Sequence, residues 1–419
     1  MTNGCGRVLS AASGERQGNG NGNKCKNRKQ FAVYVHIPFC IKKCDYCDFL
    51  SAPASADVQE RYVQALIREI RAEGAAEQAD RTEQVISVFF GGGTPSILQA
   101  GRIGDILQAL RECFVFAPEA EITVECNPGT LDAARLSSYR QAGVNRLSIG
   151  LQSADRSELR LLGRIHTWEQ FEESFALARG EGFCNINVDL MSALPGQTAA
   201  SWENTLRSVL LLHPEHISAY SLIIEEGTPF YGRYAEGTRR GLLPDEDAER
   251  AMYARTGELL AAAGYEHYEI SNYALPGFAC RHNICYWERT DYIGFGLGAA
   301  SLRQQERFSR LRGLKEYMAA AEEGRSTRTE IQKLSQKDEM EEFMFLGLRL
   351  LRGVSAARFY EQFRCRPEKV YGDVLDKYER LGLLAREGER IFLTERGIDV
   401  SNVIFSDFLL DEDALQRGL

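Results

Sequence analysis

The chain reads Tyr34-Val-His-Ile-Pro-Phe-Cys40-Ile-Lys-Lys-Cys44-Asp-Tyr-Cys47-Asp-Phe49, so three cysteines at spacing C-x3-C-x2-C directly follow a strand-forming run. Thiolates are the usual protein ligands of iron–sulfur clusters, normally one for each iron. A compact set of three thiolates therefore leaves one iron of a four-iron cluster free to bind another ligand. The alternative is a zinc site, in which His36 or a distant residue supplies the fourth ligand.

The composition is that of a globular protein. The chain has 419 residues, of which 44% are hydrophobic, enough for one large α/β domain and one smaller domain. Its net charge of -9 argues against a general attraction to nucleic acid or to anionic membranes. Eleven cysteines are too sparse for a disulfide framework, and there is no signal peptide or long apolar run. We therefore expect a reducing, cytoplasmic compartment and no nucleic-acid partner.

The first 30 residues are rich in glycine and asparagine and poor in apolar side chains. Such a composition cannot bury enough surface to fold, so residues 1–30 are predicted to be a disordered tail. Cys5 and Cys25 lie in it, and the sequence leaves their role open.

From residue 32 onward, short β-branched and aromatic runs alternate with longer amphipathic stretches. This alternation predicts βα units and a parallel sheet. The expected strands cover residues 32–38, 86–91, 121–127, 146–152, 185–192 and 216–222. Their even spacing predicts an α/β fold class, with an incomplete TIM-like (β/α)6 barrel over residues 31–325.

The pattern changes after residue 325. A helical run at 337–351 leads to two more helices, and residues 383–394 alternate like a β-hairpin. This order predicts a winged-helix-like α+β region over residues 326–419. Acidic residues outnumber basic ones from Ser355 to the end, whereas binding to phosphates needs the opposite balance. A packing or partner-docking role is therefore favoured over DNA binding.

Polar and glycine residues gather where the predicted strands end, which is where a parallel barrel binds its ligand. The second strand ends in Gly91-Gly92-Gly93-Thr94-Pro95, where absent side chains would let the backbone approach a ligand closely. Glu125, Gln152 and Asp189 lie at or near the ends of the next three strands. Each alone could be a strand-end cap or a solvated residue, but together they predict a ligand site.

The cysteine motif resembles that of the radical S-adenosylmethionine (SAM) superfamily, in which the open iron chelates the amino and carboxylate groups of SAM. Residues 34–303 look like the coproporphyrinogen III oxidase branch of that superfamily. The resemblance implies a [4Fe-4S] cluster on Cys40, Cys44 and Cys47. It implies SAM contacts at Tyr34 and Tyr46 beside the cluster, at Gly92, Gly93 and Thr94 for the methionine moiety, and at Glu125, Gln152, Arg164 and Asp189 for the carboxylate and nucleoside.

That branch holds two groups, an oxygen-independent oxidase that decarboxylates two propionates of coproporphyrinogen III and a group of heme chaperones. The oxidase follows its third cysteine with glycine and a fourth cysteine, whereas this chain continues Cys47-Asp48-Phe49. The oxidase also has an ordered extension before the barrel, where this chain has the glycine- and asparagine-rich tail. The run Arg281-His282-Asn283-Ile284-Cys285-Tyr286-Trp287 fits the H-N-x-x-Y-W motif of the chaperone group.

The resemblance implies a heme-binding loop at this motif, with contacts at His282, Asn283, Tyr286 and Trp287. A neutral imidazole is a good axial ligand for heme iron, and aromatic faces can stack on a macrocycle. Cys280 and Cys285 are alternative thiolate ligands that the sequence does not rank. The competing interpretation is a structural loop, in which His282 bonds a backbone carbonyl and the two aromatic rings seal the open side of the barrel.

The resemblance thus implies a cytoplasmic heme chaperone that binds heme, SAM and a [4Fe-4S] cluster and passes heme to acceptor hemoproteins. One alternative is the decarboxylating oxidase, and a second is a radical SAM enzyme with another substrate. Whether SAM is cleaved productively stays open. The sequence is also compatible with peripheral contact with membrane hemoproteins and with a homodimer.

Overall fold

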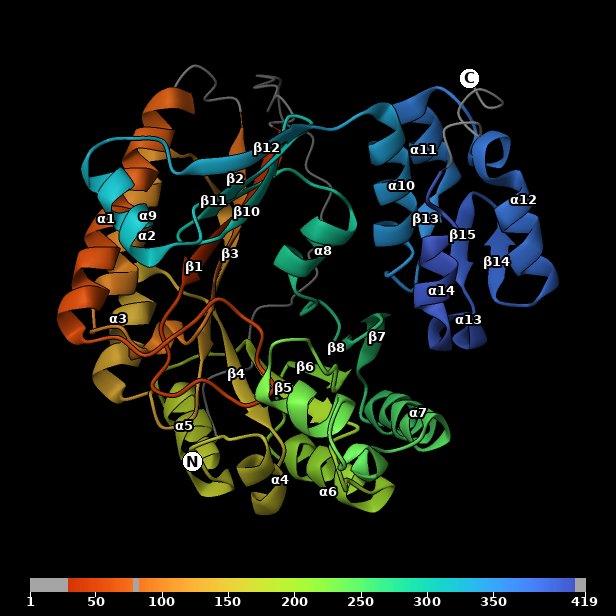
Figure 1. Cartoon of the computed structure of the whole chain (residues 1–419), viewed down its shortest axis with the longest axis horizontal. Coiled ribbons are helices and arrows are strands. Elements are labelled where there is room, and N and C mark those ends of the chain that lie inside the picture. The colour runs from red at the N-terminus through yellow and green to blue at the C-terminus, as the bar shows by residue number, and fades with distance from the viewer. Residues whose placement is uncertain (1–28, 78–82, 411–419) are drawn as a thin grey trace, which may run out of the picture.

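A computed structural model describes residues 29–77 and 83–410. They form a large α/β domain and a smaller C-terminal domain that lie side by side (Figure 1). Residues 1–28 of the predicted tail, with Cys5 and Cys25, lie outside the described residues. No helix in the described part of the chain is both long and apolar enough to span a membrane.

The large domain is built on a 12-stranded sheet in the order β12-β11-β10-β9-β1-β2-β3-β4-β5-β6-β8-β7. Its centre consists of parallel strands, namely β1 (Gln30–Ile37), β2 (Gln84–Gly92), β3 (Phe116–Cys126), β4 (Arg146–Gln152), β5 (Ile186–Ser192) and β6 (His216–Ser221). They coincide closely with the predicted strands, except that β3 begins at Phe116 rather than at residue 121. The expected incomplete (β/α)6 barrel is confirmed.

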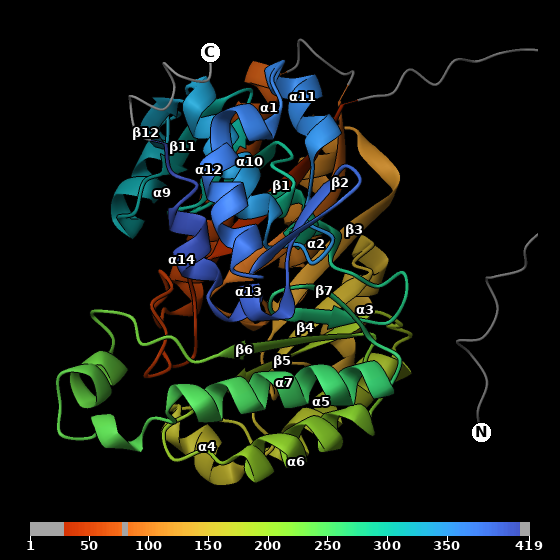
Figure 2. The same cartoon turned by 90° about the vertical axis from the view of Figure 1, so that its right-hand side faces the viewer.

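Helices connect these strands and cover the outer face of the sheet (Figures 1 and 2). They are α1 (Ala56–Glu77), α2 (Arg102–Cys113), α3 (Ala133–Ala142), α4 (Arg156–Leu161), α5 (Trp168–Gly180), α6 (Ala199–Leu210), α7 (Glu246–Ala262) and α9 (Leu314–Glu322), with short turns at Pro95–Ile97, Tyr231–Ala235 and Arg240–Leu242. Side-chain caps define several of their starts. Thr167 and Gln170, for example, form a reciprocal capping box at the start of α5.

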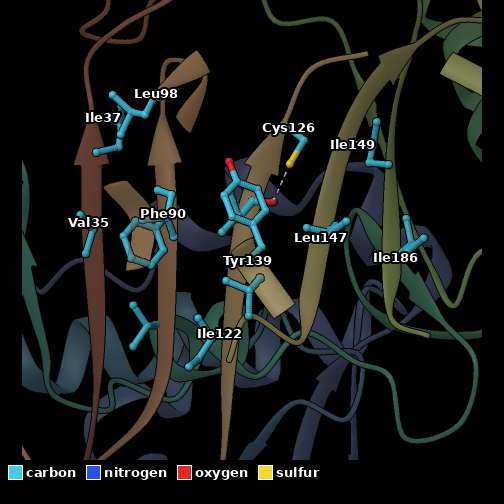
Figure 3. Packing of buried hydrophobic residues seen from close by; sticks show 14 of the residues in the cluster. Val35, Ile37, Phe90, Leu98, Ile122, Cys126, Tyr139, Leu147, Ile149 and Ile186 are labelled. Atoms are coloured by element: carbon cyan, nitrogen blue, oxygen red, sulfur yellow. Dashed lines mark hydrogen bonds between the residues drawn. The ribbon is translucent and has the colours of Figure 1, made fainter. Parts of the chain in front are cut away.

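Side chains of the central strands alternate between an apolar outer face and a polar inner face. In β3, Ile122 and Val124 lie in the apolar core, whereas Thr123 and Glu125 face the other way. Figure 3 shows how neighbouring strands add to the same core, through Val35, Ile37, Phe90, Ile122, Leu147, Ile149 and Ile186. The inner face is therefore left free for polar chemistry.

The sheet extends beyond the predicted strands at both edges. The added strands are β7 (Glu266–Glu269), β8 (Asn272–Ala274), β9 (Tyr292–Phe295), β10 (Ala300–Arg303), β11 (Glu306–Arg310) and β12 (Arg328–Lys333). β9 runs parallel to β1, and the others pair antiparallel. β12 belongs to this sheet although it follows residue 325, and the domain division at 325 and 326 stays a prediction.

The C-terminal domain has the order predicted for a winged helix. It contains α10 (Gln336–Gly347), β13 (Val354–Ser355), α11 (Ala356–Phe363), α12 (Pro367–Arg380), β14 (Leu384–Glu387), β15 (Arg390–Leu393), α13 (Glu395–Asp399) and α14 (Ser401–Ser406). The three strands form an antiparallel sheet, β13-β15-β14. Met344, Phe359, Tyr371 and Ile391 belong to its separate core.

The predicted heme-motif loop is a short helix instead, α8 (Arg281–Trp287), which lies between the sheet and the C-terminal domain (Figure 1). The buried carboxylate of Glu121 accepts hydrogen bonds from the backbone N–H groups of Arg281 at 3.1 Å and His282 at 3.2 Å. At the other end, Arg289 pairs with Glu342 of α10 at 2.8 Å. Contacts with both domains therefore hold this helix.

A buried ion network joins strand β11 to helix α1. Arg310 is 1% exposed, and its Nε donates to the carbonyl of Gly294 at 2.9 Å. Its guanidinium pairs with Glu73 at 3.1 Å and Glu69 at 3.3 Å. Burial alone would raise the pKa of Glu73, but hydrogen bonds and charges from Arg328 and Arg310 lower it. The network therefore keeps the Glu73 carboxylate charged inside the protein.

The variant Arg310→Met should lower the free energy of unfolding by about 3–5 kcal/mol, because it removes a buried cation that pairs with both Glu69 and Glu73. Urea denaturation measures this change. Arg61→Met is the matched control, since its pair with Glu322 lies at the surface and should contribute at most about 1 kcal/mol. Equal losses in the two variants would contradict a structural role for the network.

Candidate cofactor site at the open end of the barrel

The three predicted cluster cysteines lie on the loop that follows β1, and their side chains are half-buried. The hydroxyl of Thr94 donates to the Cys40 thiol sulfur at 3.6 Å, and Arg164 Nη1 donates to the Cys44 sulfur at 3.7 Å. Asn127 links these two donors, since its Nδ2 donates to Thr94 at 2.8 Å and its Oδ1 accepts from Arg164 at 2.9 Å. Asn127 was not among the predicted site residues.

His36 does not serve as a zinc ligand in this arrangement. One of its ring nitrogens bonds the hydroxyl of Tyr34 at 3.0 Å, and the other bonds the carbonyl of Leu50 at 2.9 Å. Within residues 29–77 and 83–410, no three His, Cys, Asp or Glu side chains gather closely enough to hold a single metal ion. The zinc alternative finds no support here, whereas a cluster attaches each thiolate to a different iron.

The three cysteines line a cavity of about 490 Å³ at the carboxyl ends of the central strands, which we call the cluster cavity. Of the predicted SAM positions, the cavity is lined by Tyr46, Gly92, Gly93, Thr94, Glu125, Gln152, Arg164 and Asp189. Its size is that of a typical small-molecule site. The structure therefore gathers residues that are far apart in the sequence beside the three thiols.

The donors of the cluster cavity suit a zwitterionic ligand such as SAM. Arg164 lines the cavity, and its buried Nε finds no hydrogen-bond partner among the described residues. A guanidinium group recognises a carboxylate well. Gln152 adopts a positive φ of 74°, which is strained for a side-chain-bearing residue, and its Oε1 accepts from the Tyr220 hydroxyl at 2.8 Å. The Gln152 amide therefore lines the cavity, and the hydrogen bond from Tyr220 holds it in place.

Two carboxylates with raised pKa face the same space. Burial, followed by the charge of Asp189, raises the pKa of Glu125 to about 8. Burial also raises the pKa of Asp189, although Asn187 and Ser148 donate to it at 2.7 and 3.1 Å. A bound cation would favour the ionised form of both. This wall of the cavity therefore suits the positively charged part of a ligand.

The glycines after β2 are required by packing rather than only by a ligand. A Cβ atom on Gly92, which has a φ of 109°, would lie 2.4 Å from the ring of His36. A Cβ atom on Gly93 would lie 2.5 Å from the carbonyl oxygen of Phe39. The sequence prediction assigned this glycine run to ligand approach. The structure adds that the missing side chains let β2 press against the start of the cluster loop.

A second cavity, of about 520 Å³, adjoins the first. The motif residues His282, Asn283 and Tyr286 line it, as does Tyr34, which was predicted to contact SAM. Both cavities share the wall residues Asp48, Phe49, Gly92, Glu125, Ser148 and Asp189. The structure thus places the heme-motif residues next to the predicted SAM residues.

His282 is 1% exposed and is held by two hydroxyl groups, not by the backbone carbonyl of the structural interpretation. Its Nδ1 lies 3.0 Å from Ser87 Oγ and its Nε2 lies 3.0 Å from the Tyr286 hydroxyl. The ring stacks on Phe89 at 5.0 Å. Burial, followed by the charge of Arg146, lowers the pKa of His282 to about 3. The imidazole is therefore neutral, the form that binds iron.

Trp287 and the two nearby thiols lie away from the second cavity. The Arg349 guanidinium lies 4.4 Å from the Trp287 ring centroid, so this ring packs at the domain interface rather than beside a macrocycle. The Cys280 thiol donates to Glu121 at 3.5 Å. Burial raises the pKa of Cys280 and of Cys285 to about 12, which keeps both protonated. Only His282, of these candidate iron ligands, lines the cavity.

The raised pKa of Glu125 predicts a pH effect on the cofactor-free protein. The folded chain keeps this proton up to about pH 8, whereas the ordinary value is 4.5. Between these values the folded state holds the extra proton, so the free energy of unfolding falls as pH rises. Glu125→Gln should remove this fall. As pH rises, the free energy of unfolding of the variant should therefore increase relative to that of the parent, by up to about 1.4 kcal/mol per pH unit.

Urea unfolding between pH 5 and pH 8 measures the difference. Glu323→Gln is the control, because this exposed carboxylate pairs with Arg325 at the surface. Parallel pH curves for the parent and Glu125→Gln would show that Glu125 does not retain its proton.

Comparison with known proteins agrees with this geometry. Residues 34–209 match the radical SAM superfamily, and residues 334–400 match the HemN C-terminal domain. The structure resembles coproporphyrinogen III oxidase (HemN) from Escherichia coli, a radical SAM enzyme, with a TM-score of 0.79 and 24% identity, covering 91% of this chain and 90% of that one. This similarity shows the fold.

Two relatives found by sequence share a higher identity with this chain than the oxidase does. The heme chaperone HemW of Lactococcus lactis subsp. lactis (strain IL1403) is 37% identical over 385 residues, which cover 92% of this chain and 99% of that protein. The heme chaperone HemW of Escherichia coli (strain K12) is 42% identical over 269 residues, covering 64% of this chain and 69% of that protein. Since these matches extend along most of each relative, the chain belongs to the HemW family within the radical SAM superfamily.

Proposed function

We propose that this protein is a heme chaperone, which binds heme in the second cavity and transfers it to target hemoproteins. The observation that carries the proposal is the position of His282, Asn283 and Tyr286 in a cavity that shares a wall with the cluster cavity. Relatives of 37% and 42% identity are heme chaperones. Heme and SAM would then occupy adjoining spaces in one barrel.

Cys40, Cys44 and Cys47 would hold the [4Fe-4S] cluster. When bound, the cluster offers an open iron that chelates the amino and carboxylate groups of SAM. Arg164, with its unpartnered Nε, would orient the SAM carboxylate, and Glu125 and Asp189 would face its positive charge. Thr94 and Arg164 would steady two of the thiolates through hydrogen bonds to sulfur.

His282 would be the iron ligand, because its ring is neutral and lines the second cavity. Its Nε2 is bonded to the Tyr286 hydroxyl, while Ser87 holds Nδ1. Iron binding at Nε2 requires Tyr286 to release this nitrogen. The Ser87 contact would keep the ring in orientation, as second partners of metal-bound histidines commonly do.

Heme titration of the parent and two variants tests this arrangement. His282→Ala should weaken heme binding at least about tenfold and shift the Soret band, because the axial ligand is lost. Tyr286→Phe should bind heme at least as tightly as the parent, since it frees Nε2 but keeps the ring. Cys285→Ala is the control and should match the parent. An unchanged spectrum in His282→Ala would exclude this ligand.

The competing function is oxygen-independent decarboxylation of coproporphyrinogen III, which the similarity to the oxidase fold favours. Against it, Asp48 and Phe49 take the place of the glycine and fourth cysteine of the oxidase and line both cavities. We expect the reconstituted protein to form no protoporphyrinogen from this substrate under strict anaerobiosis. Formation of that product at enzymatic rates would reverse the assignment, and productive SAM turnover without heme would indicate another substrate.

The rest of the proposal concerns location and partners. A cytoplasmic location agrees with the sequence, and no helix within the described ranges is suited to span a membrane. The acceptors would be hemoproteins, reached in the cytoplasm or by peripheral contact at a membrane surface. A homodimer is also part of this proposal, and analytical ultracentrifugation with and without SAM distinguishes it from a monomer.

A further inference from the structure

Arg146 is a buried cation that has no direct partner in the described part of the chain. It begins β4, is 2% exposed, and lines the second cavity. Its Nε has no hydrogen-bond partner, and no salt bridge involves its guanidinium among the described residues. Arg310, buried to the same degree, is bonded to two carboxylates. A buried charge without a partner is strongly unfavourable, so Arg146 requires an explanation.

The carboxylates around Arg146 are already engaged. Glu121 receives the N–H groups at the start of α8. Asp189 receives hydrogen bonds from Asn187 and Ser148. Thr123 of β3 pairs with Arg146 in the register of the two strands. Its buried hydroxyl also lacks a hydrogen-bond partner among the described residues. Two neighbouring polar groups therefore lack hydrogen-bond partners among the described residues, and one of them, Arg146, lines the second cavity.

The chemistry of these groups indicates an anion. A guanidinium stays charged in proteins and binds carboxylates through paired hydrogen bonds. Arg146 and His282 line the same cavity, and the charge of Arg146 is near enough to His282 to lower the pKa of its ring. A tetrapyrrole coordinated through His282 carries its propionate carboxylates on one edge of the macrocycle.

We propose that Arg146 binds a propionate carboxylate of the heme in the second cavity, with the Thr123 hydroxyl beside it. This inference rests on the proposed function, which supplies the heme. It goes further because it assigns the orientation of the macrocycle. The iron would lie at His282, and the edge that carries the propionates would lie at the start of β4. It also makes the free carboxylates of heme a requirement for tight binding.

The test compares heme with heme dimethyl ester, in which both carboxylates are esterified and uncharged. Both are titrated in the same detergent buffer. The parent should bind heme about 10–100-fold more tightly than the ester, as expected for hydrogen bonds to a charged group. Arg146→Met should lose most of this preference while binding the ester as the parent does. Arg281→Met, an exposed arginine of α8, is the matched control and should keep the preference.

The outcomes separate this inference from the proposed function. Equal binding of heme and ester by the parent would overturn the role of Arg146 but leave heme binding intact. Failure to bind either compound would overturn both. Equal loss of both compounds in Arg146→Met would show that the residue only supports the fold. Arg146→Lys, which keeps the charge, should retain part of the preference and replaces the methionine variant if that variant does not fold.

Discussion

The alternation of side chains along parallel strands is the constraint on which this structure depends. Strand β3 places Ile122 and Val124 in the helix-covered core and Glu121 and Glu125 on the inner face. Parallel strands also align their carboxyl ends, so the inner-face groups meet at one end of the barrel. A register shift of one residue would bury these carboxylates among apolar side chains, at a large energetic cost. The same pattern thus specifies both the fold and the site.

The cluster loop owes its position to contacts made by β1 and β2, because it has little regular structure of its own. His36 bonds the carbonyl of Leu50 at the far end of the loop, and Gly92 leaves room for the His36 ring. Gly93 lies against the backbone of Phe39 at the near end. The three thiols are therefore positioned by a few close contacts whose geometry tolerates almost no additional side-chain volume.

The central strands and the cluster cavity could be predicted because each carries a local signal: apolar runs, cysteine spacing, or polar residues at strand ends. The edge strands could not, because most of them are short, and β7, β11 and β12 are also rich in charged residues. The roles of Asn127 and Arg146 depend on neighbours from other strands, which no local pattern reveals. Trp287 was predicted to face a macrocycle, but its environment is set by Arg349 of the other domain.

The seven-residue helix that carries His282 is too short to be stable in isolation. Glu121 holds its first N–H groups from the barrel side, while Arg349 and Glu342 hold its end from the other side. Contacts from both domains consequently position this histidine. The two domains therefore form one functional unit, and a barrel separated from its C-terminal domain would lose the Arg349 and Glu342 contacts that hold the end of this helix.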